Sequence, residues 1–270
     1  MRLTVSIAQM DIALGNPEAN LAKARQMIAE AKSRGSEIIL LPELWAAGYN
    51  LKNAGKYATS TDRGTFAAVA RLAEENGIYV IGSLLSERDG CYYNTATIFS
   101  PQGELVGSYD KVHLFRLMGE DQYLAAGTTA PVFDLPWGKA ALAVCYDLRF
   151  PELFRRYALL GAKAVFVPAE WPCPRIEHWR VLLRARAIEN QCFIIACNRV
   201  GESKGERFCG RSAIYDPWGE PMVEGGEEES LLTAEIDLDL VDEVRRRIPI
   251  FEDRQEELYS IHQFEESGVL

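Results

Sequence analysis

The chain has 270 residues, 48% of them hydrophobic, and a formal net charge of −10 at pH 7. This apolar content is enough for a sizeable core, and no low-complexity linker divides the sequence, so we expect a single domain over residues 1–270. The acidic balance argues against a nucleic-acid partner, because nucleic acids select basic surfaces. The sequence has no run of about 18 apolar residues, which argues against a membrane span.

The start of the chain and its cysteines both favour a cytoplasmic protein. Residues 1–5 lead directly into a predicted strand, without the charged and apolar regions of a signal peptide. The six cysteines are scattered and include no CxxC pair, so we expect reduced thiols. With only three histidines in addition, the sequence predicts no metal site.

The first half of the chain predicts strands and helices in alternation. A strand at 3–9 is followed by a helix from Asn16-Pro17 to Arg34, with Asn16 as the N-cap and Gly35 after the last turn. A second strand is predicted at 37–41, a second helix at 65–76 and a third strand at 78–84. The order is therefore β-α-β-α-β.

The second half repeats this order after a set of turns. Pro-x-Gly turns at 101–103, 136–138 and 217–219 predict hairpins. The repeated elements are strand 139–145, helix 151–160, strand 163–167, helix 175–190 and strand 192–197, followed by strand 231–236 and helix 238–247. Two such halves can stack their sheets face to face, which predicts an α/β fold arranged as a four-layer α-β-β-α sandwich.

Cys145 is the candidate nucleophile of the sequence. It ends the apolar run 139–145 and precedes a helix that begins at Pro151. Unpaired N–H groups and the helix dipole at such a junction lower a thiol pKa and can bind an oxyanion. A buried, inert cysteine is a common alternative. Arg149 and Glu152, in the same segment, are expected to form structural ion pairs.

Two charged residues also follow predicted strands. Glu43 comes after Pro42 at the exit of strand 37–41, and Lys111 comes after a strand at 104–110. Taken alone, each is more simply a solvated loop residue. Binding sites in α/β sheets gather at the carboxyl ends of strands, so Glu43, Lys111 and Cys145 can meet in spite of their separation in sequence.

Together these segments resemble the carbon–nitrogen hydrolase (nitrilase) superfamily, whose enzymes use a Glu, a Lys and a Cys in this chain order. The resemblance extends from Ile7-Ala-Gln9 to Ile248-Pro249, Asp253-Arg254 and Leu258-Tyr259. It implies the four-layer sandwich and no cofactor. Glu120 matches a second glutamate of the family, which would orient Glu43 or the substrate amide. The segments 145–152, 178–191 and 216–219 are most similar to the omega-amidase branch.

The resemblance implies amide hydrolysis through a thioester. Glu43 would accept the proton of Cys145 during attack on the carbonyl and pass it to the leaving amine. Lys111 and the backbone N–H of Tyr146 would bind the oxyanion. The implied partner is a small-molecule amide, most simply a short dicarboxylate monoamide such as 2-oxoglutaramate, and family members commonly form homodimers or higher homo-oligomers.

The segment 170–172 follows strand 163–167, and in the family this loop lines the substrate pocket. Trp171 is therefore a candidate substrate-binding residue, as is Glu170. Related chains often carry a neutral residue at the position of Glu170, and an acid there would repel an omega-carboxylate. Arg175 and Arg116 are candidates to bind a carboxylate, because a guanidinium group binds it with two hydrogen bonds.

Other interpretations stay open at this point. An N-carbamoyl amino acid hydrolase or a small aliphatic amidase would use the same three residues, and a non-catalytic thiol-bearing scaffold protein would need none of them. A Cys-His enzyme with His113 or His178 as base lacks a recognisable orienting group. A serine hydrolase is disfavoured, because the segment 210–212 lacks the second glycine of the G-x-S-x-G turn.

Overall fold

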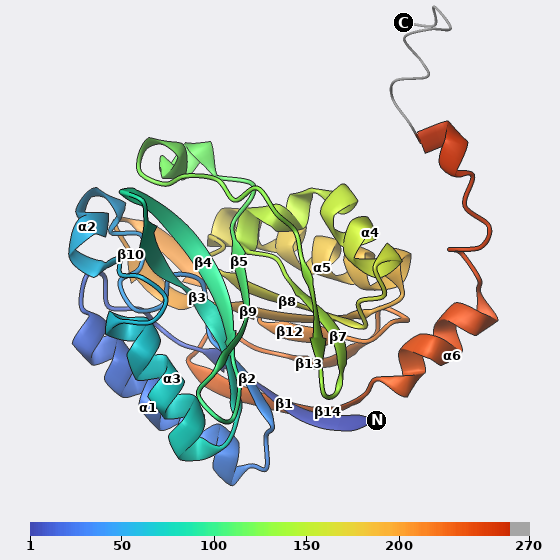
Figure 1. The fold of residues 1–270 in the computed structure, drawn as a ribbon, viewed down its shortest axis with the longest axis horizontal. Helices are drawn as coiled ribbons and strands as arrows, with labels where there is room; N and C mark the ends of the chain where they lie inside the picture. Colours follow the sequence, from blue (N-terminus) through green and yellow to red (C-terminus); the bar gives the residue numbers. More distant parts are fainter. Residues whose placement is uncertain (260–270) are drawn as a thin grey trace, which may run out of the picture.

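The computed structural model describes residues 1–259, which form two six-stranded sheets packed face to face with helices on both outer sides (Figure 1). The strand order is β14-β1-β2-β3-β4-β5 in the first sheet and β13-β12-β9-β8-β7-β6 in the second. The predicted four-layer α-β-β-α sandwich is confirmed. The last eleven residues of the expected domain, 260–270, lie outside the described part of the chain.

The first sheet comes from the N-terminal half and one late strand. Its strands are β1 (Arg2–Gln9), β2 (Ile38–Leu40), β3 (Tyr79–Arg88), β4 (Cys91–Phe99), β5 (Leu105–Asp110) and β14 (Ser230–Asp237). Strands β1, β2 and β3 are parallel, and α1 (Pro17–Ser33) and α3 (Gly64–Asn76) connect them. Helix α1 begins as predicted, because the side chain of Asn16 accepts a hydrogen bond from the N–H of Ala19.

The second sheet has the same central pattern. Its strands are β6 (Val132–Leu135), β7 (Gly138–Leu142), β8 (Ala164–Ala169), β9 (Phe193–Asn198), β12 (Ala213–Tyr215) and β13 (Pro221–Glu224). Strands β7, β8 and β9 are parallel, with α4 (Pro151–Leu159) and α5 (Ile176–Asn190) between them. The three predicted hairpins are confirmed as β4–β5, β6–β7 and β12–β13.

Shorter elements complete the described chain. They are α2 (Ala54–Tyr57), α6 (Asp239–Arg247), the hairpin β10 (Val200–Ser203) with β11 (Glu206–Cys209), and the 3₁₀ helices η1 (Leu51–Asn53), η2 (Arg116–Met118), η3 (Glu120–Gln122), η4 (Cys145–Arg149), η5 (Cys173–Arg175) and η6 (Glu256–Tyr259). The sequence did not predict the β10–β11 hairpin, although Lys204 and Gly205 both adopt the positive φ of a two-residue hairpin turn. In the described residues, no helix has the length and apolar character needed to cross a lipid bilayer.

Alternation along β2 explains how its short run of apolar residues joins two layers. Ile38 and Leu40 belong to the core between the two sheets, whereas Ile39 belongs to the core beneath α1 and α3. Successive side chains of a strand point to opposite faces, so one continuous apolar strand can serve both layers. Figure 1 shows α1 and α3 outside the first sheet and α4 and α5 outside the second.

Two cysteines differ from the sequence prediction. Cys173 and Cys209 form a disulfide, so the expectation of six reduced thiols is wrong. An antiparallel bridge between Pro172 and Phe208 brings the two segments together, although the cysteines are 36 positions apart in sequence. The disulfide ties the loop after β8 to the β10–β11 hairpin.

Candidate active site

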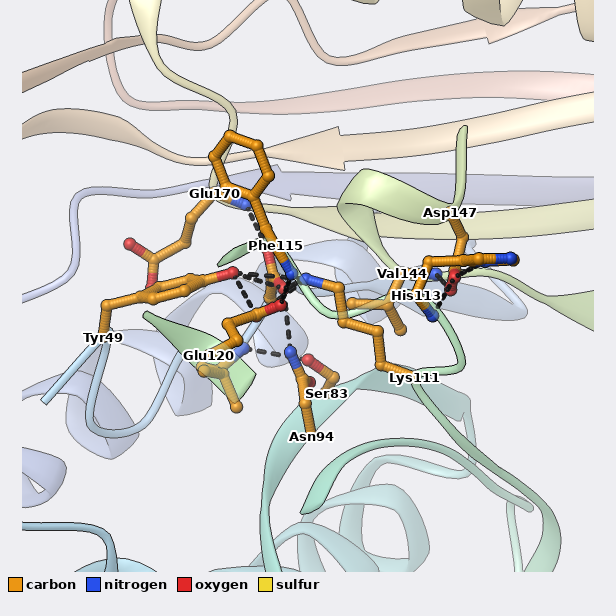
Figure 2. Close-up of polar contacts among 12 residues, drawn as sticks. Tyr49, Ser83, Asn94, Lys111, His113, Phe115, Glu120, Val144, Asp147 and Glu170 are labelled. Atoms are coloured by element: carbon orange, nitrogen blue, oxygen red, sulfur yellow. Dashed lines mark hydrogen bonds and ion pairs between the residues drawn. The ribbon is translucent and has the colours of Figure 1, made fainter. Parts of the chain in front are cut away.

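Three predicted site residues meet in one buried network. Glu43 lies in the turn after β2, Lys111 directly follows β5, and Glu120 begins η3. The Nζ atom of Lys111 donates to Oε1 of Glu43 at 2.8 Å and to Oε1 of Glu120 at 2.7 Å (Figure 2). All three side chains are 0% exposed, so the ion pairs are shielded from water.

The charges of this network perturb one another strongly. Burial alone would lower the pKa of Lys111, but the carboxylates of Glu120 and Glu43 raise it above its ordinary value, so the group is an ammonium. Burial raises the pKa of Glu120, and the charge of Lys111 opposes that change. Residues 1–259 contain no cluster of three or more His, Cys, Asp or Glu side chains suited to a metal ion, and Lys111 is the cation between these carboxylates.

Glu43 is held in one orientation by hydrogen bonds to both of its carboxylate oxygens. Oε1 accepts from Lys111, from Nδ2 of Asn94 at 2.8 Å and from the hydroxyl of Tyr49 at 2.8 Å. Oε2 accepts from the backbone N–H of Glu170 at 2.8 Å. Because each carboxylate oxygen offers about two lone-pair sites, Oε2 is the atom with capacity for a further proton.

Left-handed backbone occurs beside Glu43 and at Cys145. Leu44 has a φ of 44° and Cys145 a φ of 47°, a region that costs a non-glycine residue on the order of 1–3 kcal/mol. Hydrogen bonds hold both turns: the N–H of Leu44 donates to Oγ of Ser83 at 2.9 Å, and the N–H of Val144 donates to Oδ2 of Asp147 at 2.8 Å. The surrounding structure therefore fixes the directions of the Glu43 and Cys145 side chains.

The environment of Cys145 corrects two expectations. Strand β7 ends at Leu142, and Cys145 begins the single 3₁₀ turn η4, while α4 starts only at Pro151. Burial, followed by the adjacent carboxylate of Glu43, raises the pKa of the Cys145 thiol well above its usual range, so the predicted lowering is wrong. Desolvation outweighs the weak dipole of so short a helical turn. The thiol therefore needs a base in order to react.

His113 is engaged in the packing that supports the Cys145 turn. Oδ1 of Asp147 accepts from the backbone N–H of His113 at 3.0 Å and lies 2.7 Å from its Nδ1 (Figure 2). The hydroxyl of Tyr109 donates to Oδ2 of Asp147 at 2.7 Å, and the His113 ring stacks on Phe150 with 3.6 Å between ring centroids. Asp147 thus links the segment after β5 to the turn that carries Cys145.

A small pocket opens beside Cys145. Its lining residues are Phe115, Cys145, Tyr146, Arg149, Glu170, Trp171, Pro172 and Arg175. The structure therefore brings together all four predicted substrate-binding residues, Tyr146, Glu170, Trp171 and Arg175. Arg116, the other candidate for binding a carboxylate, lies instead in a neighbouring surface depression.

Arg149 is a pocket residue that the sequence interpretation assigned to a structural role. Its guanidinium carbon lies 4.7 Å from the ring centroid of Trp171, and that of Arg175 lies 5.6 Å from the ring centroid of Phe115. Within residues 1–259, neither Arg149 nor Glu152 forms an ion pair, so the predicted pairing is wrong; Arg175 has no acidic partner there either. Stacking on aromatic rings holds the guanidinium groups of Arg149 and Arg175 in place and leaves their positive charges available to an anionic ligand.

Glu170 does not stand in the pocket as an isolated negative charge. Its Oε2 accepts from Nη1 of Arg199 at 2.8 Å, and Nη2 of Arg199 donates to Asp11 at 2.8 Å. Burial raises the pKa of Glu170 to about 7, although Arg199 lowers it. Among the described residues Oε1 of Glu170 has no hydrogen-bond partner. Sequence reasoning missed Arg199, because nothing in the sequence near it signals this contact.

The chain is similar to several known proteins. The family described as carbon–nitrogen hydrolase matches residues 4–246. The chain is 42% identical over 260 residues to 2-oxoglutaramate amidase of Bacillus subtilis, and this alignment covers 96% of this chain and 100% of that protein. It is 34% identical over 254 residues to an omega-amidase of Xenopus laevis, covering 90% and 92% of the two chains. The chain also resembles the solved structure of a carbon–nitrogen hydrolase superfamily protein from Xanthomonas campestris, which has an arsenic adduct in its active site. The TM-score is 0.88 at 31% identity, and the match covers 94% of this chain and 98% of that chain.

Proposed function

Because this chain belongs to the carbon–nitrogen hydrolase family, we propose that it is an omega-amidase, which releases ammonia from the terminal amide of a short dicarboxylate monoamide such as 2-oxoglutaramate. The observation that carries the proposal is the buried Glu43–Lys111–Glu120 network next to the Cys145 thiol. The names of the two amidases compared above support the substrate class.

In the first step, Sγ of Cys145 bonds to the amide carbon as the thiol proton moves to Oε2 of Glu43. The raised pKa of the thiol means that little thiolate exists beforehand, so proton transfer accompanies attack. Glu43 suits this role because its Oε1 is fully occupied by donors while Oε2 has a free acceptor site.

The carbonyl oxygen becomes an oxyanion when the tetrahedral intermediate forms. The ammonium of Lys111 and the backbone N–H of Tyr146 would stabilise it, and a donor of this kind contributes about 3–4 kcal/mol to transition-state stabilisation. The field of Lys111 is strong there because the group is 0% exposed and little water screens it.

The cycle closes in two further steps. Glu43 gives its proton to the nitrogen, the C–N bond breaks, and ammonia leaves a thioester on Cys145. Glu43 then takes a proton from water as the water oxygen attacks the thioester carbon, and it returns that proton to sulfur when the C–S bond breaks. One amide and one water therefore become one carboxylic acid and one ammonia.

The pocket arginines support a substrate with a second, anionic end. Arg149 and Arg175 both line the pocket, and neither pairs with an acid in the described chain. A guanidinium group binds a carboxylate with two parallel hydrogen bonds. We therefore propose that these arginines bind the carboxylate of the substrate and that Trp171 forms an apolar wall beside it.

Ammonia release from two matched amides tests this proposal. Succinamate and butanamide have chains of equal length, but only succinamate ends in a carboxylate. We expect Cys145-dependent turnover that favours succinamate and 2-oxoglutaramate over butanamide, with Cys145→Ala as the inactive control. Arg149→Met or Arg175→Met should lower kcat/KM for succinamate about 10-fold or more, because each removes a charge-assisted hydrogen bond.

Substrate choice in the same assay also distinguishes the alternatives. Arg156→Met, an exposed position of α4, should leave the preference unchanged. A preference for butanamide or for an N-carbamoyl amino acid would keep the three site residues but replace the omega-amidase assignment. Turnover that survives Cys145→Ala would contradict the proposed chemistry itself.

The pKa of Glu170 predicts how substrate binding changes with pH. Since that pKa is raised to about 7, the carboxyl group gains negative charge as the pH rises through neutrality. A negative Glu170 repels the substrate carboxylate, so KM for succinamate should increase between about pH 6 and 8, with little change for butanamide. Glu170→Gln should flatten this increase. Identical pH profiles of KM in the two enzymes would show that Glu170 does not influence binding.

We further propose that the chain is one cytoplasmic domain that works as a homodimer or higher homo-oligomer. Large apolar side chains are exposed on α5, at Val181 (63%) and Ile188 (48%), and at the end of α4, at Leu159 (46%) and Leu160 (43%). Exposed apolar side chains such as these are candidates for burial between subunits. Light scattering after gel filtration would measure the mass, and a monomer of 30.2 kDa would contradict the proposal.

A further inference from the structure

Tyr49 contacts both carboxylates of the buried network. Its hydroxyl oxygen lies 2.8 Å from Oε1 of Glu43 and 2.7 Å from Oε1 of Glu120, and Nζ of Lys111 lies 3.3 Å away (Figure 2). The side chain comes from the turn after β2 and is buried. One phenol oxygen therefore stands between two acids that follow different strands.

The number of protons at this position is informative. A phenol has one O–H proton, so Tyr49 can donate to only one of the two carboxylates. The other short contact is a hydrogen bond only if that carboxyl group carries a proton and donates it to the phenol oxygen. Otherwise two oxygen atoms with no proton between them would face each other at less than 3 Å in a buried site.

The charge of the network leads to the same result. Two ionised carboxylates and one ammonium leave one uncompensated negative charge, and all three groups are 0% exposed. An uncompensated buried charge is costly, and one added proton removes it. Burial raises the pKa of Glu120 in spite of Lys111, which favours Glu120 as the group that holds this proton.

We propose that Tyr49 is a positioning residue that keeps one shared proton between Glu120 and Glu43 in the resting enzyme. In the favoured arrangement Glu120 donates to Tyr49 and Tyr49 donates to Glu43, so Glu43 stays ionised and can accept the thiol proton. If both protons move one step along this chain, Glu120 becomes ionised, Glu43 becomes neutral and Tyr49 is unchanged. No proton enters or leaves the site.

This inference rests on the proposed function and adds a reason for the second glutamate. When Glu43 accepts the thiol proton, a protonated Glu120 leaves the network with a net charge of +1 opposite the oxyanion. If Glu120 were ionised, it would cancel the charge of Lys111 at the moment when that charge is needed. The shared proton therefore makes the positive charge of Lys111 available to the transition state.

The test is the pH dependence of kcat for Tyr49→Phe at saturating succinamate, which removes the effect of Glu170 on KM. The groups that face the Tyr49 hydroxyl are Glu43, Lys111, Glu120 and Cys145. The carboxyl group of Glu170 lies beside Gly48, and the ammonium of Lys204 donates to the carbonyl oxygen of Tyr49 at 2.8 Å. Loss of the hydroxyl removes a hydrogen bond that exists only while Glu120 is protonated. We assign the basic limb of the kcat profile to loss of the Glu120 proton. This limb should therefore move to lower pH by about one unit, because Glu120 holds its proton less tightly without the hydroxyl.

Tyr57→Phe is the matched control, since the Tyr57 hydroxyl contacts only Asn50 and the carbonyl of Gly15 among the described residues. It should leave the basic limb in place.

If Tyr49→Phe lowers kcat without moving that limb, the hydroxyl has only a structural role and this inference is wrong. Cys145→Ala is assayed in parallel: activity in that variant would overturn the proposed function, whereas an inactive Cys145→Ala with an unshifted Tyr49→Phe overturns only the shared proton.

A second measurement tests the proposal without the Tyr49→Phe variant, in case that variant does not fold. Infrared difference spectroscopy detects the C=O stretch of a protonated buried carboxyl group. In the Glu170→Gln background, which removes the other buried acid of raised pKa, the band should be present at neutral pH and disappear in Glu120→Gln. Absence of the band in the Glu170→Gln enzyme would contradict the proposal.

Discussion

Cys145→Ser is expected to fold normally and to lose turnover by about 10⁴-fold or more. The substitution is close to isosteric, so the turn at η4 should persist with its positive φ of 47°. The serine hydroxyl is a far weaker nucleophile, and its proton is harder for Glu43 to remove than that of a thiol. The loss should therefore appear in kcat, while circular dichroism and the unfolding midpoint stay close to those of the parent enzyme.

Cys91→Ser is the control for this loss, because Cys91 is an exposed free cysteine outside the pocket. It should retain full activity. Iodoacetamide labelling adds an independent measurement: substrate should protect Cys145 and leave Cys91 reactive. If Cys145→Ser kept more than about a tenth of the parent activity, the nucleophile would have to be another group.

Lys111→Met is expected to damage both stability and catalysis. The variant leaves the ionised Glu43 buried without its cation, and breaking a buried ion pair from one side costs about 3–5 kcal/mol in the free energy of unfolding. Because the pKa of Lys111 is raised, its contribution is fully present at neutral pH and is lost only as the pH rises far into the alkaline range. The remaining folded enzyme should lose kcat by about 10²–10³-fold, the effect of one oxyanion donor.

Urea unfolding and ammonia release on the same preparation separate the two effects of Lys111→Met. Lys163→Met is a suitable control, since Lys163 pairs with the half-exposed Asp242 and its loss should cost at most about 1 kcal/mol. Adding Glu43→Gln to Lys111→Met should recover part of the stability but none of the activity. An unchanged free energy of unfolding in Lys111→Met would mean that water enters the network.

The omega-amidase assignment of the sequence resemblance agrees with the family match and with the compared amidases. Local signals were sufficient for most elements: Asn16-Pro17 begins α1, and the three Pro-x-Gly turns form hairpins. Element ends were less accurate. Strand β3 continues to Arg88, beyond the predicted end at 84, because it pairs with β4 from Val80 to Arg88. Pairing with another strand sets such an end, and the local sequence does not encode it.

The sequence by itself determined the family, the order of elements and which residue types lie at strand exits, because capping, turn chemistry and apolar alternation act over a few residues. Only the tertiary structure decided which groups contact those residues and how their pKa values change. Tyr49, Asn94 and Arg199 became visible as partners of Glu43 and Glu170 once distant strands met. The raised pKa of Cys145 likewise follows from burial in the complete fold, since desolvation depends on everything packed around a group and not on its neighbours in sequence.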